Sequence, residues 1–240
     1  MAQTSTFVLV HGANLGGWCW RGVETILASH GHEVISPSLD LSLAASLDSH
    51  IGEVTQLILS RDLQGIVLVG HSYGGMVITG VADQVRDRIS RLVYLDAAVP
   101  ADGEDFASHI PGLSITEAED RRDFYRSLSP DGVWLHPPPL QLVGVTDAEA
   151  IESITPHLVP QPLSTWLEPV RLRNGGAVGI PKTYVLATSP PTEVMGYPRH
   201  GEVAKQGGDW TYREVQAGHA LMLASPGDTA ALLLEAVGCC

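Results

Sequence analysis

A serine set between glycines is the strongest chemical signal in the chain. The segment Gly70-His-Ser-Tyr-Gly74 matches the pattern G-x-S-x-G, with the apolar run 66–69 before it and a helical pattern after it. In this strand–turn–helix context the pattern marks a nucleophile. The turn is too sharp for neighbouring side chains, and it points a helix N-terminus at the serine, where the helix dipole favours a developing anion. We therefore predict that Ser72 is a nucleophile.

A serine hydroxyl is a weak nucleophile unless a base removes its proton. The chain has ten histidines, and in folds built on this turn the order along the chain is Ser, acid, His. His219 follows the last predicted strand, so its loop returns to the edge of the sheet where Ser72 lies. We predict that His219 is the base, with a solvent-facing loop histidine as the alternative. His71, inside the turn, is interpreted as a packing or hydrogen-bonding residue.

A histidine base needs a carboxylate that fixes its tautomer and stabilises the imidazolium. Asp96 ends the strand 89–95, so its side chain should emerge at the same edge as Ser72, although Asp at a strand exit also caps turns. Glu193 lies in the loop after the strand 183–187, behind two prolines. We favour Asp96 and keep Glu193, or no carboxylate at all, as alternatives.

The developing oxyanion should be bound by two backbone N–H groups. One belongs to the residue after the nucleophile, Tyr73, and the other to the glycine-rich loop 11–17 after the first strand. We choose Ala13 as the second donor, with Gly12 and Asn14 as competitors. Both competitors are also expected to contact the substrate, and an ordinary turn is the alternative interpretation of the loop.

The elements that would position these groups alternate between short apolar runs and amphipathic runs. This alternation predicts βαβ units and a mostly parallel, six-stranded sheet flanked by helices, an α/β fold. The predicted strands are 7–10, 33–36, 65–69, 89–95, 183–187 and 211–215, and the predicted helices are 20–27, 51–58, 76–85 and 229–237.

The stretch from about 101 to 179 breaks this alternation. It carries a proline cluster at 137–139 and scattered aromatic residues, and no run typical of a buried strand. Insertions of this length are usually functional. We predict one domain over 1–240 in which this insertion is a cap over the ligand-binding edge of the sheet, with Trp134 and Phe124 contacting the substrate. An irregular, solvated excursion is the alternative.

Composition excludes several classes of function. The chain carries 14 Lys+Arg against 27 Asp+Glu, a net charge of −13, which argues against nucleic acid as a partner. No apolar run reaches the roughly 20 residues of a membrane span, and no signal peptide is visible, so we expect a cytoplasmic protein. Three cysteines and no metal-binding motif predict neither a disulfide framework nor a metal site. A homodimer is left open.

Three segments together carry a family resemblance: 8–20, Gly70-His-Ser-Tyr-Gly-Gly75 and Ala217-Gly-His-Ala-Leu-Met222. The chain resembles the α/β-hydrolase superfamily, and within it the branch of plant methylesterases, hydroxynitrile lyases and small bacterial esterases. The resemblance spans the first strand to the terminal helix and is loose only in the insertion. It implies a capped core, a Ser–His–Asp triad, a small-molecule substrate and no cofactor.

Two departures bear on the chemistry that the resemblance implies. Cyanohydrin cleavage in that branch goes with a hydroxyl side chain at the position of Gly12 and a lysine at that of Ala220, so ester hydrolysis is favoured. Relatives usually carry the acid after the penultimate strand, where this chain has no Asp.

The residues thus predict a serine esterase that cleaves a small, largely apolar ester, thioester or lactone through an acyl-enzyme on Ser72. An altered acid motivates a second hypothesis, a cofactor-free cyclase, lyase or isomerase. A third is a ligand-binding protein without turnover.

Overall fold

The computed structural model describes residues 4–109, 118–189 and 197–238. Its centre is a six-stranded sheet in which every neighbouring pair of strands is parallel, in the order β2-β1-β3-β4-β7-β8. The predicted α/β fold is therefore confirmed. The strands are β1 (Thr6–Val10), β2 (Glu33–Ile35), β3 (Ile66–His71), β4 (Ile89–Leu95), β7 (Lys182–Ala187) and β8 (Trp210–Val215).

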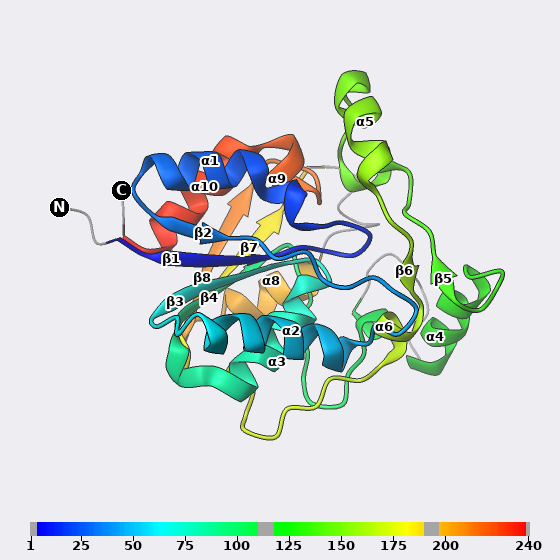
Figure 1. Cartoon of the computed structure of the whole chain (residues 1–240), viewed down its shortest axis with the longest axis horizontal. Coiled ribbons are helices and arrows are strands. Elements are labelled where there is room, and N and C mark those ends of the chain that lie inside the picture. The colour runs from blue at the N-terminus through cyan, green and yellow to red at the C-terminus, as the bar shows by residue number, and fades with distance from the viewer. Residues whose placement is uncertain (1–3, 110–117, 190–196, 239–240) are drawn as a thin grey trace.

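Helices cover both faces of this sheet (Figure 1). On one face lie α1 (Arg21–Ser29), α9 (Leu221–Ala224) and α10 (Pro226–Ala236); on the other lie α2 (Leu47–Ser60), α3 (Gly74–Val85) and α8 (Pro198–Ala204). The strands β1, β3 and β7 are almost wholly buried because helices cover both faces, whereas the edge strands β2 and β8 are largely half-buried. In β1, for example, Val8 packs into the core under α2 and α3, whereas Leu9 packs into the core under α1 and α10.

Sequence patterns missed the two shortest helices of these layers, α8 and α9, which are too short to show a helical period. They also placed the start of α2 too late. That helix begins after Ser46, whose side chain accepts from the Ser49 amide while the Ser49 hydroxyl closes the reciprocal bond of a capping box.

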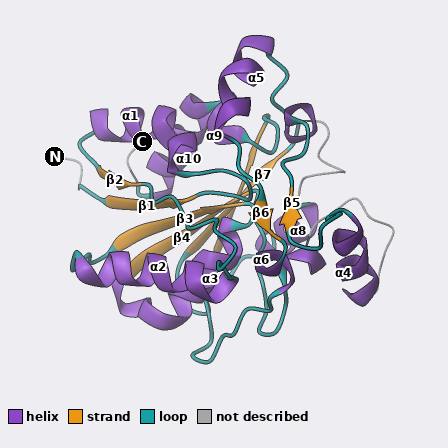
Figure 2. Cartoon of the chain, turned by 45° about the vertical axis from the view of Figure 1, so that its right-hand side comes forward, coloured by secondary structure: helices purple, strands orange, loops and turns teal. Residues whose placement is uncertain are grey.

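We call the segment 101–179 the cap segment. Its helices and strands lie beyond the ends of the sheet strands, whereas its last residues, 173–179, run back along α3 to Asp83 and Arg86 (Figures 1 and 2). It contains α4 (Ala118–Ser127), β5 (Trp134–Leu135), α5 (Ala148–Ile154), β6 (Gln161–Pro162) and α6 (Ser164–Leu167). Within it, β5 and β6 pair antiparallel. Strands of two residues are too short to give a pattern. The division of the chain into one domain with a cap stays a prediction.

Short 3₁₀ helices complete the described elements, at Gly17–Trp20, Arg86–Arg88, Phe106–Ser108, Leu140–Val143 and Thr155–His157. Within the described ranges, no helix has both the length and the apolar character that crossing a bilayer requires.

Candidate active site

Ser72 lies in the tight turn between β3 and α3. Its φ of 53° is in the left-handed region, which a residue other than glycine adopts only where the surrounding structure enforces it. The close packing of α3 against the ends of the strands enforces this conformation of Ser72. A Cβ at Gly74 would lie 2.7 Å from the Val10 carbonyl oxygen, and one at Gly75 would lie 2.0 Å from that of Ala98. The glycines next to Ser72 are thus required by the lack of space, as predicted.

Asp96 and His219 are joined by a short hydrogen bond, with 2.7 Å between His219 Nδ1 and Asp96 Oδ2. The Asp96 side chain is fully buried and leaves the end of β4. Two contacts with β7 fix it: the Asp96 amide donates to the Val185 carbonyl at 2.8 Å, and Oδ1 accepts from the Ala187 amide at 3.4 Å. The favoured carboxylate therefore lies in contact with the predicted base, and its role as the acid stays a prediction. Glu193 lies outside the described residues.

The loop that carries His219 is held from two sides. His71 Nε2 donates to the His219 carbonyl oxygen at 2.9 Å, and the Ala220 amide donates to the Val143 carbonyl of the cap segment at 2.8 Å. Burial, and then the nearby His219, lower the pKa of His71 well below its usual value. His71 is therefore neutral and acts as the hydrogen-bonding residue that the sequence suggested.

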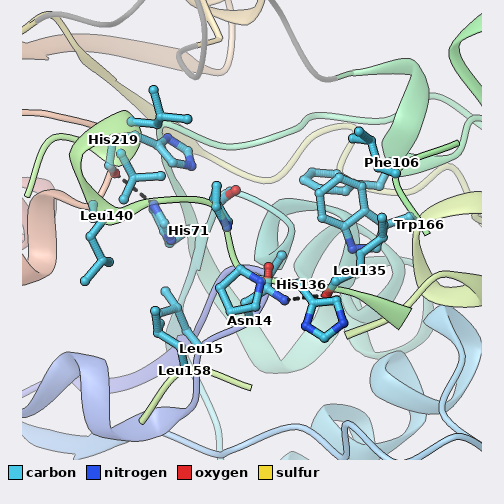
Figure 3. A pocket seen from close by; sticks show the side chains of 18 of the residues that line it. Asn14, Leu15, His71, Phe106, Leu135, His136, Leu140, Leu158, Trp166 and His219 are labelled. Atoms are coloured by element: carbon cyan, nitrogen blue, oxygen red, sulfur yellow. Dashed lines mark hydrogen bonds between the residues drawn. The ribbon is translucent and has the colours of Figure 1, made fainter. Parts of the chain in front are cut away.

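Ser72 and His219 line one cavity of about 450 Å³. Figure 3 shows His71 and His219 at one side of it and two aromatic rings, Phe106 and Trp166, at the other. These rings contact each other edge to face, 4.9 Å between centroids. The cap segment supplies most of the apolar lining, including Phe106, Phe124, Tyr125, Leu140, Leu158 and Trp166.

Of the two cap aromatics expected to contact the substrate, only Phe124 lines the cavity. Trp134 does not, and the reason is the alternation of side chains along a strand. Its neighbour Leu135 lines the cavity, so the next side chain on β5 points to the other face.

The loop after β1 contributes three cavity residues, Ala13, Asn14 and Leu15. The Asn14 amide donates to Gln161 Oε1 of β6 at 3.0 Å, so it is already engaged. The amides of Ala13 and Tyr73 donate to no other group in the described part of the chain. Gly12 lies behind them, where a Cβ would be 2.6 Å from His71 Nδ1, and it does not line the cavity.

Among the described residues, no hydrogen bond joins Ser72 Oγ to His219. Catalytic hydrogen bonds in ligand-free structures are often long and tighten only when substrate binds. In the same part of the chain, no three His, Cys, Asp or Glu side chains are placed to hold a metal ion.

Two further residues of this site carry no local sequence signal. Gln161 contacts Asn14 across 147 residues, and Tyr197, which lines the cavity beside His219, follows a stretch without periodicity. Only the folded chain brings them to the site.

A model of the alpha/beta hydrolase family matches residues 7–232. The chain therefore belongs to the alpha/beta hydrolase family. It is similar to the carbendazim hydrolyzing esterase of Nocardioides sp. (strain SG-4G), 35% identical over 237 residues that cover 94% of this chain and 97% of that protein. It is also similar to methylesterase 2 of Arabidopsis thaliana, 32% identical over 54% of this chain and 48% of that protein.

Solved structures agree. An extracellular alpha/beta-hydrolase from a Paenibacillus species, described as sharing structural and functional homology with tobacco salicylic acid binding protein 2, superposes with a TM-score of 0.78 at 25% identity over 97% of this chain and 98% of that one. A pyrethroid hydrolase from Sphingobium faniae JZ-2 shares the fold, with a TM-score of 0.76 at 21% identity over 98% of each chain. The chain is an esterase of this family, as its residues predicted.

Proposed function

We propose that the chain is a serine esterase that cleaves a small, largely apolar ester, thioester or lactone through an acyl-enzyme on Ser72. The observation that carries the proposal is the Asp96–His219 pair, 2.7 Å apart, at the cavity that Ser72 also lines. An imidazole whose Nδ1–H is held by a buried carboxylate presents Nε2 as a base.

In the proposed reaction, Ser72 Oγ attacks the substrate carbonyl while His219 Nε2 takes the hydroxyl proton. Asp96 keeps the Nδ1–H bond and stabilises the imidazolium. The amides of Ala13 and Tyr73 bind the oxyanion, and the latter stands at the N-terminus of α3. His219 then gives its proton to the leaving group as the carbonyl bond to that group breaks. A water molecule releases the acid by the same steps.

The proposed substrate class follows from the cavity. Its aromatic and aliphatic lining favours apolar acyl and leaving groups, and the cap segment over Ser72 limits their size. We further propose that the cap segment works as a cap, and that Phe124 and Asn14 contact the substrate. Two similar proteins are named for hydrolysing carbendazim and pyrethroids, so these compounds should be tested as substrates.

The test is hydrolysis of p-nitrophenyl butyrate by the wild-type chain and by Ser72→Ala. Loss of the nucleophile should lower kcat by about 10³-fold or more. Ser153→Ala, which removes an exposed hydroxyl on α5, is the matched control and should keep full activity. Full activity in Ser72→Ala would disprove the proposal.

The cyclase, lyase or isomerase hypothesis was motivated by an altered acid, and no further observation favours it, because Asp96 holds His219 Nδ1 at 2.7 Å as the acid of a hydrolytic triad would. A binding protein without turnover likewise has no feature in its favour. The cytoplasmic location and the homodimer stay predictions.

A further inference from the structure

Tyr197 is a buried residue of the cavity to which the triad assigns no task. Its side chain is 3% exposed and lines the cavity with Ser72 and His219. It precedes α8, and its carbonyl accepts from the hydroxyl of Tyr184 in β7 at 3.2 Å. The Tyr184 hydroxyl also reaches the Ala97 carbonyl, at 3.1 Å. Tyr197 is thus tied to the strands that position Asp96.

The Tyr197 ring faces the catalytic pair. Its centroid lies 5.8 Å from that of His219, with the rings inclined by 42°. Its hydroxyl interacts with the Ser72 side chain. Burial raises the pKa of Tyr197 far above its usual value, and the Ser72 contact only partly offsets this. The hydroxyl therefore keeps its proton, so it is a hydrogen-bond donor and not a base.

The oxyanion already has two donors in the amides of Ala13 and Tyr73, so Tyr197 is not needed there. Apart from His219, the triad offers no hydrogen-bond donor to the leaving group. His219 protonates that group, and Tyr197 stands beside His219 and the attacking Ser72 Oγ. A donor in this place reaches the atom that takes up negative charge as its bond to the carbonyl carbon breaks.

We propose that Tyr197 is a catalytic residue whose hydroxyl donates a hydrogen bond to the leaving-group oxygen during acylation. The bond from the carbonyl carbon to that oxygen breaks, its electron pair stays on the oxygen, and the proton comes from His219. Tyr197 keeps its own proton throughout. The role rests on the proposed function, and it fits the site for esters of weakly acidic alcohols, which depart poorly without such help.

Leaving-group dependence tests this role. Methyl butyrate and p-nitrophenyl butyrate share an acyl group. They differ in how strongly the enzyme must stabilise the negative charge on the leaving oxygen. Since kcat/KM reports acylation, Tyr197→Phe should lower kcat/KM for the methyl ester about tenfold to a hundredfold, the effect of losing one hydrogen bond to a charged oxygen. For the p-nitrophenyl ester the loss should stay below about threefold, because that anion needs little support. The ring packing against His219 is kept, and circular dichroism verifies the fold.

Tyr125→Phe is the matched control. Tyr125 also lines the cavity and is 6% exposed, and burial raises its pKa as well, but its nearest described ring partners are Phe124 and Trp166 and not the catalytic pair. This variant should change kcat/KM for both esters by the same factor. The role is overturned if Tyr197→Phe lowers kcat/KM by the same factor for both esters. It is also overturned if Tyr125→Phe lowers kcat/KM for the two esters as unequally as Tyr197→Phe does.

The outcome for Tyr197 is separable from that of the proposed function. If the wild type hydrolyses both esters and Ser72→Ala neither, while Tyr197→Phe shows no split, the esterase stands and the Tyr197 role falls. If the wild type hydrolyses neither ester, both fall together.

Discussion

His219 and Asp96 are 123 residues apart in the chain, yet Nδ1 of one and Oδ2 of the other lie 2.7 Å apart in the folded protein. The contact is made where two neighbouring parallel strands, β4 and β7, end at the same edge of the sheet. His219 comes to that edge from the loop after β8. Asp96 thus follows β4 and not β7, the penultimate strand, after which the family resemblance places the acid.

Replacing the carboxylate should disable the base without unfolding the chain. Asp96→Asn keeps the shape of the side chain but no longer enforces the tautomer with the proton on Nδ1, so kcat for p-nitrophenyl butyrate should fall about 10³- to 10⁴-fold. Glu193→Gln, which tests the alternative acid, should retain activity. The account of the acid is wrong if the Glu193 variant loses activity and the Asp96 variant does not.

Gly75 and Gly52 offer a contrast between two helical glycines. A methyl group at Gly75 would lie 2.0 Å from the Ala98 carbonyl oxygen, so Gly75→Ala should destabilise the fold by several kcal/mol, about 3 or more. Nothing lies within 4 Å of a Cβ at Gly52, in α2, so Gly52→Ala should stabilise by about 0.5–1 kcal/mol. Urea unfolding measures both. Equal effects of the two changes would contradict the packing described for the Ser72 turn.

Gln161 should act as a positioning residue for the oxyanion loop. Its Oε1 accepts from the Asn14 amide and its Nε2 donates to Thr165 Oγ1, both inside the protein. Gln161→Leu frees the loop next to Ala13 and should lower kcat about tenfold or more, with little change in KM. Thr165→Val removes only the second contact and should cost less in kcat. A change of KM alone in Gln161→Leu would point to a binding role instead.

Phe124 and Trp134 separate residues that line the cavity from residues that merely belong to the cap segment. Phe124 lines the cavity and Trp134 does not. Phe124→Ala should therefore raise KM for p-nitrophenyl butyrate about tenfold through lost apolar contact. Trp134→Ala should leave KM within about twofold, even where it lowers the thermal midpoint. Steady-state kinetics of both variants decides, and the opposite order would place the substrate elsewhere.

Buried histidines should make the fold sensitive to acid. Burial lowers the pKa of His11 from 6.5 to about 4 and that of His200 to about 3. Below pH 6.5 the unfolded chain binds protons at these residues that the folded chain does not, so stability falls as the pH falls. Each such histidine contributes a slope of about 1.4 kcal/mol per pH unit until its folded pKa is reached.

Urea unfolding across this pH range measures the slope. His200→Asn should reduce the slope of stability against pH by the contribution of one proton, because one buried histidine has been removed. A stability that stays constant from pH 6.5 down to 4 would show that these histidines are accessible to protons in the folded protein.

Much of the fold was predictable because its central strands are buried on both faces. β3 is buried over its whole length, and its apolar run 66–69 leads directly into G-x-S-x-G, so one segment indicates both the strand and the nucleophile. Asp96 could be favoured for a similar reason: a polar residue that ends such a strand emerges at the edge where parallel strands carry their ligands.

The rest of the site lies beyond local patterns. Gln161 reaches Asn14 only because β6 pairs with β5, and neither strand is long enough to show alternation. Trp134 was misplaced because the side of the sheet that an aromatic residue faces depends on register, which composition does not encode. Tyr197 reaches the triad through its anchor on Tyr184, a tertiary contact without a sequence pattern.

The central claim is that Ser72 is an activated nucleophile, and labelling with a fluorophosphonate followed by peptide mass spectrometry tests it most directly. The account predicts one stoichiometric adduct on the peptide that contains Ser72, formed much more slowly in Asp96→Asn and absent in Ser72→Ala. An adduct on another residue, or a folded wild-type protein that takes up no label, would contradict it.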